Sequence, residues 1–433
     1  MTVWNDDLKT TDSHLGRRAF LGSAVAGTAL LAAPAVLGQA RPRLVVVGGG
    51  SGGATMARYV AMQGAGAIDV TLIEPSRTYY TCYFSNLYLG GFWPFEGLSH
   101  SYATLAATHG VHVLHDWAIG VDRDAQTVAL AGGGSVGYDR LVLSPGIDFV
   151  EGSVPGWDQA ASSRMPHAYK PGTQTALLKA QVEAMREGGV FAMIAPPNPY
   201  RCPPGPYERI SMVAHMLKER NPTAKILLID PKPTYSKQAL FEEGFARHYP
   251  GMIERIGPDL GADMVEVNPA EMTVTVDGMV ESVDVCNVIP AQKAGRIAEL
   301  AGLTNEAGWV PVDPFTMKSR DDAAIHVLGD ASQQGDMPKS GFSANSQAKV
   351  AANVIRHELT DARLFPARYA NTCWSLLAPE DGVKVGASYE ATEEKIATVD
   401  SFVSQTGEDA ELRAETFRES IGWYNGIVAD MFS

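Results

Sequence analysis

The chain has 433 residues, 45% of them hydrophobic and 19% charged, with a formal net charge of −14. That length leaves room for two or three domains, and the composition is typical of a globular protein. Because the phosphate backbone repels so acidic a chain, a nucleic-acid partner is excluded and a basic macromolecular partner is expected.

The first 40 residues are predicted to be a twin-arginine signal peptide. The stretch GRRAFL at 16–21 carries two adjacent arginines, and an uncharged run rich in alanine and glycine extends to Ala40. Small residues precede the expected cleavage site after Ala40. We therefore expect export to the periplasm by the twin-arginine route. The alternative, a retained membrane anchor, is disfavoured because the run is only weakly apolar, and no other segment predicts a membrane span.

A dinucleotide-binding fold is predicted at the start of the remaining chain. The apolar strand Leu44–Val47 leads into Gly48, Gly50 and Gly53, which satisfy the spacing G-x-G-x-x-G. A helical stretch and a second apolar strand follow, ending at Glu74. A carboxylate about 20 residues after such a turn grips a ribose, while the glycines let the backbone approach the pyrophosphate. A chance glycine turn is the weaker alternative.

Two later motifs favour FAD over NAD at this site. The stretch AIHVLGDA at 324–331 resembles the second FAD motif of the glutathione-reductase superfamily, whose aspartate, here Asp330, meets the ribitol chain. The stretch YDRLVLSPG at 138–146 resembles the intermediate motif of that superfamily, with Ser-Pro-Gly in place of the commoner Thr-Gly.

A proline-rich loop occupies the corner where a second nucleotide-binding domain would carry its glycine turn. It runs from Ala195 to Glu208, between an apolar strand and a helical run, and it holds Cys202. Prolines fix φ and remove N–H donors, so the loop suits a rigidly held thiol better than a phosphate. We therefore expect no NAD(P)H site here.

These patterns predict an α/β fold with two nucleotide-binding-type domains. The FAD domain is discontinuous, at 41–150 and 296–365, and an NAD-domain-like module without an NAD site is inserted at 151–295. Residues 366–433 form a C-terminal interface segment rich in aromatic residues, among them Trp423 and Tyr424. For those terminal aromatics, internal packing is favoured over a role in docking.

Four cysteines are present, at Cys82, Cys202, Cys286 and Cys373. Without C-x-x-C-H or C-x-x-C, a c-type haem, zinc or iron–sulfur site on this chain is disfavoured, and no metal site is expected. Cys286 lies in a strand pattern and is interpreted as a buried small hydrophobe. Cys202 and Cys373 lie in turn-flanked segments, where an oxidising compartment permits a disulfide; a structural staple and a redox disulfide remain equal alternatives.

Taken together, the segments resemble the flavoprotein subunit of flavocytochrome c sulfide dehydrogenases, periplasmic enzymes of sulfur-oxidising bacteria. YYTCY at 79–83, RCPPGPYE at 201–208 and NTCW at 371–374 are the most specific of them. The resemblance spans nearly the whole chain after the predicted signal, and it makes residues 366–433 a flavocytochrome-type segment. One departure is Trp374, which stands where a tyrosine is usual and removes a hydroxyl group.

The resemblance implies the chemistry of the site. Cys82 would carry FAD covalently, Cys202 and Cys373 would form a redox-active disulfide over the flavin, and Glu208 would be the acid/base. The expected reaction is oxidation of sulfide to sulfur or polysulfide, with electrons passing to a haem-bearing cytochrome c subunit. The helix that begins near Lys339 would aim its N–H groups at the flavin; Lys339 itself is either part of the cofactor site or a solvated surface charge.

Three alternative functions stay open at this point. A sulfide:quinone oxidoreductase shares the flavin and the cysteine pair but would need a membrane-facing amphipathic segment. An NADH-dependent disulfide reductase is disfavoured by the proline loop. A redox partner that reactivates a sulfur-oxidation carrier protein would use the same flavin and disulfide.

Overall fold

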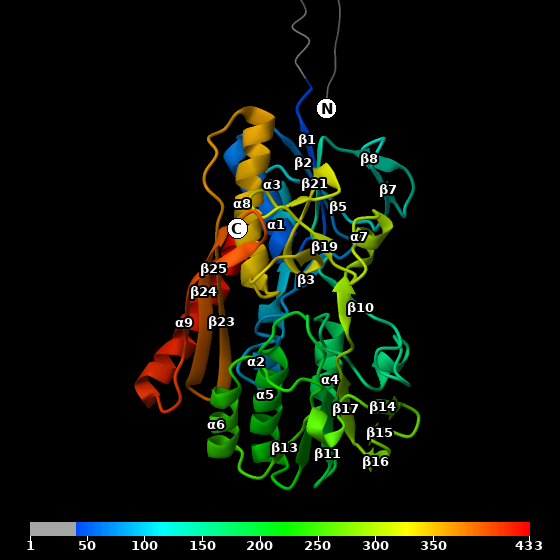
Figure 1. The fold of residues 1–433 in the computed structure, drawn as a ribbon, viewed down its shortest axis with the longest axis vertical. Helices are drawn as coiled ribbons and strands as arrows, with labels where there is room; N and C mark the ends of the chain where they lie inside the picture. Colours follow the sequence, from blue (N-terminus) through cyan, green and yellow to red (C-terminus); the bar gives the residue numbers. More distant parts are fainter. Residues whose placement is uncertain (1–39) are drawn as a thin grey trace, which may run out of the picture. The chain divides into compact units, whose positions relative to one another are not determined.

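A six-stranded sheet carries the glycine turn and joins two distant stretches of the chain (Figure 1). Its order is β20-β21-β9-β1-β2-β5. The pair β20–β21 is antiparallel, and all other neighbouring strands pair in parallel. Central strand β1 is buried along almost its whole length, as its unbroken run of branched residues predicts. The bounds are β1 (Arg43–Val47), β2 (Asp69–Ile73), β5 (His112–Leu114), β9 (Arg140–Leu143), β20 (Lys318–Ser319) and β21 (Asp322–Val327).

The structure is a computed structural model that describes residues 40–433, so the predicted signal peptide lies outside the described residues. Helices α1 (Ser51–Gly64) and α8 (Gly341–Thr360) pack against each other beside the six-stranded sheet (Figure 1). Among the described residues, none of the helices has the length and apolar character needed to cross a membrane.

A second, four-stranded parallel sheet belongs to the inserted region. Its order is β13-β12-β11-β17, and the proline loop joins β11 to α5. An antiparallel meander, β14-β15-β16, precedes β17, and β10 pairs with β18 where the chain passes between the two sheets. The bounds are β10 (Ile147–Phe149), α4 (Thr173–Glu183), β11 (Val190–Ile194), α5 (Gly205–Arg220), β12 (Lys225–Ile229), α6 (Gln238–His248), β13 (Ile253–Ile256), β14 (Val265–Asn268), β15 (Thr273–Val276), β16 (Met279–Ser282), β17 (Val285–Val288) and β18 (Gln292–Ala294).

The C-terminal segment is an antiparallel sheet followed by a long helix (Figure 1). It consists of β23 (Arg368–Ala378), β24 (Asp381–Ala391), β25 (Ile396–Val403) and α9 (Ala410–Phe432). Strand β23 packs against α5, which belongs to the region of the four-stranded sheet, and against α8, which lies beside the six-stranded sheet. Tyr424 is buried on α9, which confirms the packing interpretation for that residue, whereas Trp423 is half-buried.

Shorter elements complete the described chain. They are β3 (Thr78–Tyr80), α2 (Ser85–Leu89), β4 (Ser99–Ser101), α3 (Ala103–Ala107), β6 (Ala118–Asp122), β7 (Thr127–Leu130), β8 (Ser135–Gly137), α7 (Arg296–Leu300), β19 (Val310–Pro311) and β22 (Ser332–Gln333). The fold is therefore the predicted α/β class, with two parallel-sheet domains and a C-terminal segment.

Candidate functional site

The glycine turn between β1 and α1 is as tight as its sequence predicts. A Cβ on Gly48, whose φ is +97°, would lie 2.4 Å from the carbonyl oxygen of Ser144. A Cβ on Gly53 would lie 1.8 Å from the carbonyl oxygen of Gly48. Only glycine fits at either position. Glu74, at the end of β2, accepts a hydrogen bond from the Gly49 N–H at 2.8 Å, so the predicted carboxylate does lie at the turn.

A groove runs from this turn past Gly50, Glu74, Asp330 and Cys82. Asp330 follows β21 and is buried; its Oδ2 accepts a 2.6 Å hydrogen bond from Nε of Arg201. Its Oδ1 has no hydrogen-bond partner among the described residues. A buried carboxylate oxygen left free beside a groove is a ready acceptor for a ligand hydroxyl, such as those of a ribitol chain. The residues present therefore fit FAD.

Cys82 lies where this groove meets a second cavity. It follows β3 and lines both spaces, together with Arg201 and the first residues of α8. Burial raises the pKa of the Cys82 thiol, while the nearby Arg201 guanidinium opposes that change. The structure thus places the predicted attachment residue within the groove that fits the cofactor, and the covalent bond itself remains a prediction.

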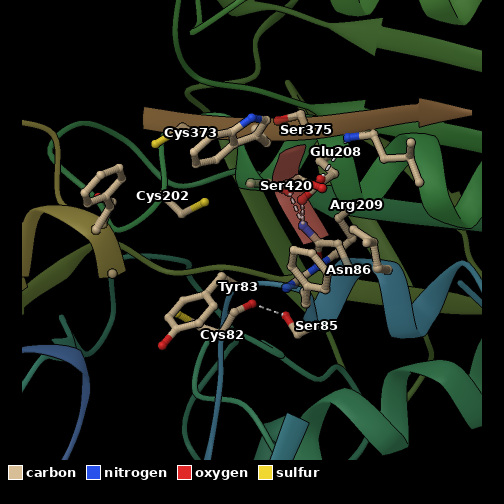
Figure 2. Close-up of a pocket in the computed structure, with 18 of the residues that line it drawn as sticks. Cys82, Tyr83, Ser85, Asn86, Cys202, Glu208, Arg209, Cys373, Ser375 and Ser420 are labelled. Atoms are coloured by element: carbon tan, nitrogen blue, oxygen red, sulfur yellow. Dashed lines mark hydrogen bonds between the residues drawn. The ribbon is translucent and has the colours of Figure 1, made fainter. Parts of the chain in front are cut away.

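The second cavity is lined by both Cys202 and Cys373 (Figure 2). Cys202 comes from the proline loop and Cys373 from β23, and both are free thiols in the structure. In the view of Figure 2, the side chain of Cys202 is drawn between those of Cys373 and Cys82. The packing of β23 against α5 and α8 brings the two cysteines to the same cavity.

The backbone at Cys202 is held in an unusual conformation. Its φ is +56°, a region that non-glycine residues seldom adopt, and its N–H donates a 2.7 Å hydrogen bond to the Lys339 carbonyl. Such conformations persist where the surroundings enforce them, often at functional sites. Burial raises the pKa of the Cys202 thiol well above its usual value, and the neighbouring Cys373 and Glu208 raise it further.

Glu208 lies in the first turn of α5 and lines the same cavity. Its two oxygens accept hydrogen bonds of 2.8 Å from the Asn86 side chain and 2.9 Å from the Leu376 N–H. Burial raises the pKa of Glu208, which these hydrogen bonds and the cations of Lys237 and Arg209 oppose. A carboxyl group with a raised pKa, facing the cysteine pair, suits proton transfer.

Three residues of the site were not predicted from the sequence. Arg209 is buried and donates to Oδ1 of Asn86 at 3.1 Å and to three acceptors in the inserted region. Asn86 in turn links Arg209 to Glu208. Arg209 directly follows the motif RCPPGPYE, and Asn86 lies three residues after YYTCY. Their closeness to these motifs in the sequence could have indicated that they belong to the site. Lys237 reaches β23 from the start of α6, and nothing in its local sequence marks it.

Of the two alternatives for Lys339, the solvated surface charge is wrong. Its ammonium is buried and donates to the carbonyls of Asp330 and Ser332, both at 2.7 Å, while lying 3.7 Å from the centre of the Trp309 ring. It is therefore not a surface charge. Its side chain is not among those that line the groove or the cavity, but it contacts Asp330, so its part in the cofactor site stays a prediction. Packing against Trp309 turns it inward, so it braces the Asp330 loop. Ser340 and Gly341, which begin α8, do line both spaces.

Cys286 lies in β17 and is fully buried, and burial raises the pKa of its thiol to about 12. This agrees with its interpretation as a small core residue.

Comparison with known families covers most of the described chain. The model of the central region of the sulfide dehydrogenase [flavocytochrome c] flavoprotein chain matches residues 175–290. The flavin-binding model of flavocytochrome c sulphide dehydrogenase matches 365–432, and the pyridine nucleotide-disulphide oxidoreductase model matches 42–174.

Individual relatives agree with these matches. The chain is 52% identical over 44 residues to the sulfide dehydrogenase [flavocytochrome c] flavoprotein chain of Chlorobaculum thiosulfatiphilum, a stretch that covers 10% of this chain and 90% of that sequence. It is 23% identical over 318 residues to the mitochondrial sulfide:quinone oxidoreductase of Mus musculus, covering 70% of this chain and 67% of the relative.

A solved structure shares the fold. The sulfide:quinone oxidoreductase of Aquifex aeolicus superimposes with a TM-score of 0.67 at 20% identity, covering 90% of this chain and 92% of that one. With the flavin-binding match, the groove that fits FAD and the paired cysteines, the chain is a flavoprotein oxidoreductase that belongs to the sulfide-oxidising family of flavocytochrome c sulfide dehydrogenase flavoprotein chains.

Proposed function

We propose that this chain oxidises sulfide at a disulfide between Cys202 and Cys373, in the periplasm, with FAD attached through Cys82 and a cytochrome c subunit as the electron acceptor. The observation that carries this proposal is the single cavity that holds both cysteines and opens into the FAD groove. The family match supports the substrate and the partner.

The first step opens the disulfide. Hydrosulfide forms a new S–S bond with one cysteine sulfur while the original S–S bond breaks. The electron pair of the broken bond stays on the other cysteine sulfur, which becomes a thiolate. A second hydrosulfide then takes the outer sulfur of the persulfide as a hydrogen disulfide anion and leaves a thiol. FAD, when bound, supplies the two-electron acceptor that returns the cysteine pair to the disulfide.

The surrounding residues prepare this chemistry. Asn86 and the Leu376 N–H fix the Glu208 carboxylate beside the pair, where it can hold the proton that the incoming sulfide or the persulfide releases. Arg209 places a buried positive charge on the wall of the cavity, which favours entry of the hydrosulfide anion. Aromatic side chains such as Phe417 and Trp423 form an apolar part of the wall.

A sulfide:quinone oxidoreductase is the second candidate, supported by the likeness to the Aquifex aeolicus structure. The C-terminal end of α9 does not support this candidate. Ile427, Met431 and Phe432 are buried in the protein core and so cannot contact lipid, whereas Leu412 at the start of the helix is exposed.

The choice of acceptor tests the proposed function. Sulfide is added to the FAD-loaded protein together with a soluble cytochrome c or with a short-chain quinone, and reduction of each is followed by absorbance. We expect sulfide-dependent reduction of the cytochrome at a much higher rate than of the quinone. A preference for quinone would support the second candidate. If sulfide reduces neither acceptor while the disulfide form of a sulfur-carrier protein is consumed, the reactivating function replaces both.

The covalent flavin has its own test. After acid denaturation and proteolysis, we expect FAD to remain on the peptide that contains Cys82, because its thiol lies in the cofactor groove. Cys82→Ser should release all of the flavin into the supernatant. Cys202→Ser serves as the matched control and should retain it. Free flavin from the unmodified protein would contradict the attachment.

A further inference from the structure

Lys237 is a buried lysine that spans two parts of the fold. It caps α6 with a φ of +61°, and its side chain extends from the inserted region to β23 of the C-terminal segment. There its ammonium donates hydrogen bonds to Oγ of Ser375 at 2.8 Å and to the carbonyl oxygen of Cys373 at 3.1 Å. Lys237 is thus tied directly to the strand that carries one of the two reactive cysteines.

Among the residues that the structure describes, this ammonium has no carboxylate as a hydrogen-bond or ion-pair partner. Within residues 40–433, none of its hydrogen bonds goes to an acidic side chain and none of the ion pairs includes it. By contrast, buried Lys232 forms an ion pair with Asp230 at 2.7 Å. Buried lysines are normally paired, so an ammonium held only by neutral acceptors is incomplete on its own. The ionisable groups that face it are Cys373 on β23, Glu208 on α5 and Cys202 on the proline loop.

We propose that Lys237 is a positioning residue that supplies the counter-charge for the thiolate formed when sulfide opens the Cys202–Cys373 pair. This inference rests on the proposed function. Attack by hydrosulfide on the disulfide carries one negative charge into a cavity with a largely apolar lining. The ammonium of Lys237, held by Ser375 and by the backbone of Cys373, balances that charge without moving.

The pH dependence follows from the state of this lysine. Burial lowers the pKa of Lys237 to about 8, and the negative charges of Cys373, Glu208 and Cys202 act to raise it. The lysine is a cation below its pKa and neutral above it. Its stabilisation of a neighbouring thiolate is therefore fully present at low pH. This stabilisation is lost as the pH rises through the pKa that Lys237 has when the thiolate is present.

The test measures the thiols directly. The FAD-loaded protein is reduced with a phosphine, and the rate of alkylation of Cys202 and Cys373 by iodoacetamide is followed against pH by peptide mass spectrometry. Lys237→Gln keeps a hydrogen-bond donor but removes the charge. We expect it to raise the apparent thiol pKa by about one unit, so that alkylation at pH 8 slows about tenfold.

Two further measurements separate charge from structure. The midpoint potential of the cysteine pair should fall by about 30 mV in Lys237→Gln, the equivalent of a tenfold change for a two-electron couple. Lys237→Arg should restore both the potential and the alkylation profile. Lys179→Gln is the matched control: Lys179 also donates to a backbone carbonyl, that of Tyr88 at 2.7 Å, but its pKa is not affected by any cysteine.

An unchanged alkylation profile and potential in Lys237→Gln would overturn the inference. If that variant does not load FAD, Ser375→Ala removes one anchor of the ammonium and should slow alkylation in the same direction; no slowing would overturn the inference equally. Because neither measurement uses sulfide, loss of sulfide turnover in the unmodified protein would count against the proposed function alone.

Discussion

Replacement of Cys202 by serine is expected to abolish sulfide-dependent reduction of the flavin, by roughly 10³-fold or more. Serine cannot form the disulfide, so the incoming hydrosulfide meets no electrophilic sulfur. Cys373→Ser should have an effect of the same size, since the proposal requires both sulfurs of one bond. Anaerobic stopped-flow mixing with sulfide, followed at the flavin absorbance, measures the rate.

Two controls make this result specific to the disulfide. Dithionite should reduce the flavin of both variants as it does in the unmodified protein, because direct reduction does not need the cysteine pair. In Cys286→Ala, sulfide should reduce the flavin at nearly the rate seen in the unmodified protein, since Cys286 lies in the core strand β17 and does not line the cavity. A Cys373 variant that keeps more than about a tenth of the rate would show that Cys202 acts without a partner, against the paired mechanism.

The parts of the site that follow from local chain geometry were predictable. The turn at Gly48–Gly53 and the acid at Glu74 depend on a strand, a tight turn, a helix and a second strand in immediate succession. These steps are set by neighbouring residues, and the structure places Glu74 at the turn as expected. The sequence-based boundaries of the domains remain predictions.

The parts that depend on long-range packing were not predictable from the residues alone. Whether Cys202 and Cys373 meet is decided by the packing of β23 against α5, and the residues themselves left a staple and a redox pair as equal alternatives. Lys237 enters the site because α6 and β23 are neighbours. The inward direction of Lys339 depends on Trp309 and on two carbonyl acceptors, which no local pattern reveals.

A buried arginine on α9 belongs to an ion-pair network between the C-terminal segment and the inserted region, and its replacement should lower stability. Arg413 on α9 is 1% exposed. Its guanidinium donates to Glu408 at 2.8 Å, to Asp381 on β24 at 3.0 Å and to Glu243 on α6 at 3.4 Å. Two basic side chains of α6 pair with the same carboxylates: Arg247 with Glu243, and His248 Nε2 with Oδ2 of Asp381 at 2.6 Å. Arg413 is the fully buried cation of this network, and without it Glu408, Asp381 and Glu243 would each lose a buried positive charge.

Arg413→Met is expected to lower the free energy of unfolding by about 3–5 kcal/mol, the usual effect of removing one partner from a buried ion pair. Urea unfolding followed by tryptophan fluorescence measures the change. Arg418→Met, at an exposed position of the same helix, should stay within about 0.5 kcal/mol of the unmodified protein. A loss below about 1 kcal/mol in Arg413→Met would mean that the carboxylates regain water, and that the network is not the main attachment of the segment. Because β24 pairs with β23 opposite Cys373 at Val385, a large loss would also tie the position of the reactive cysteine to this distant arginine.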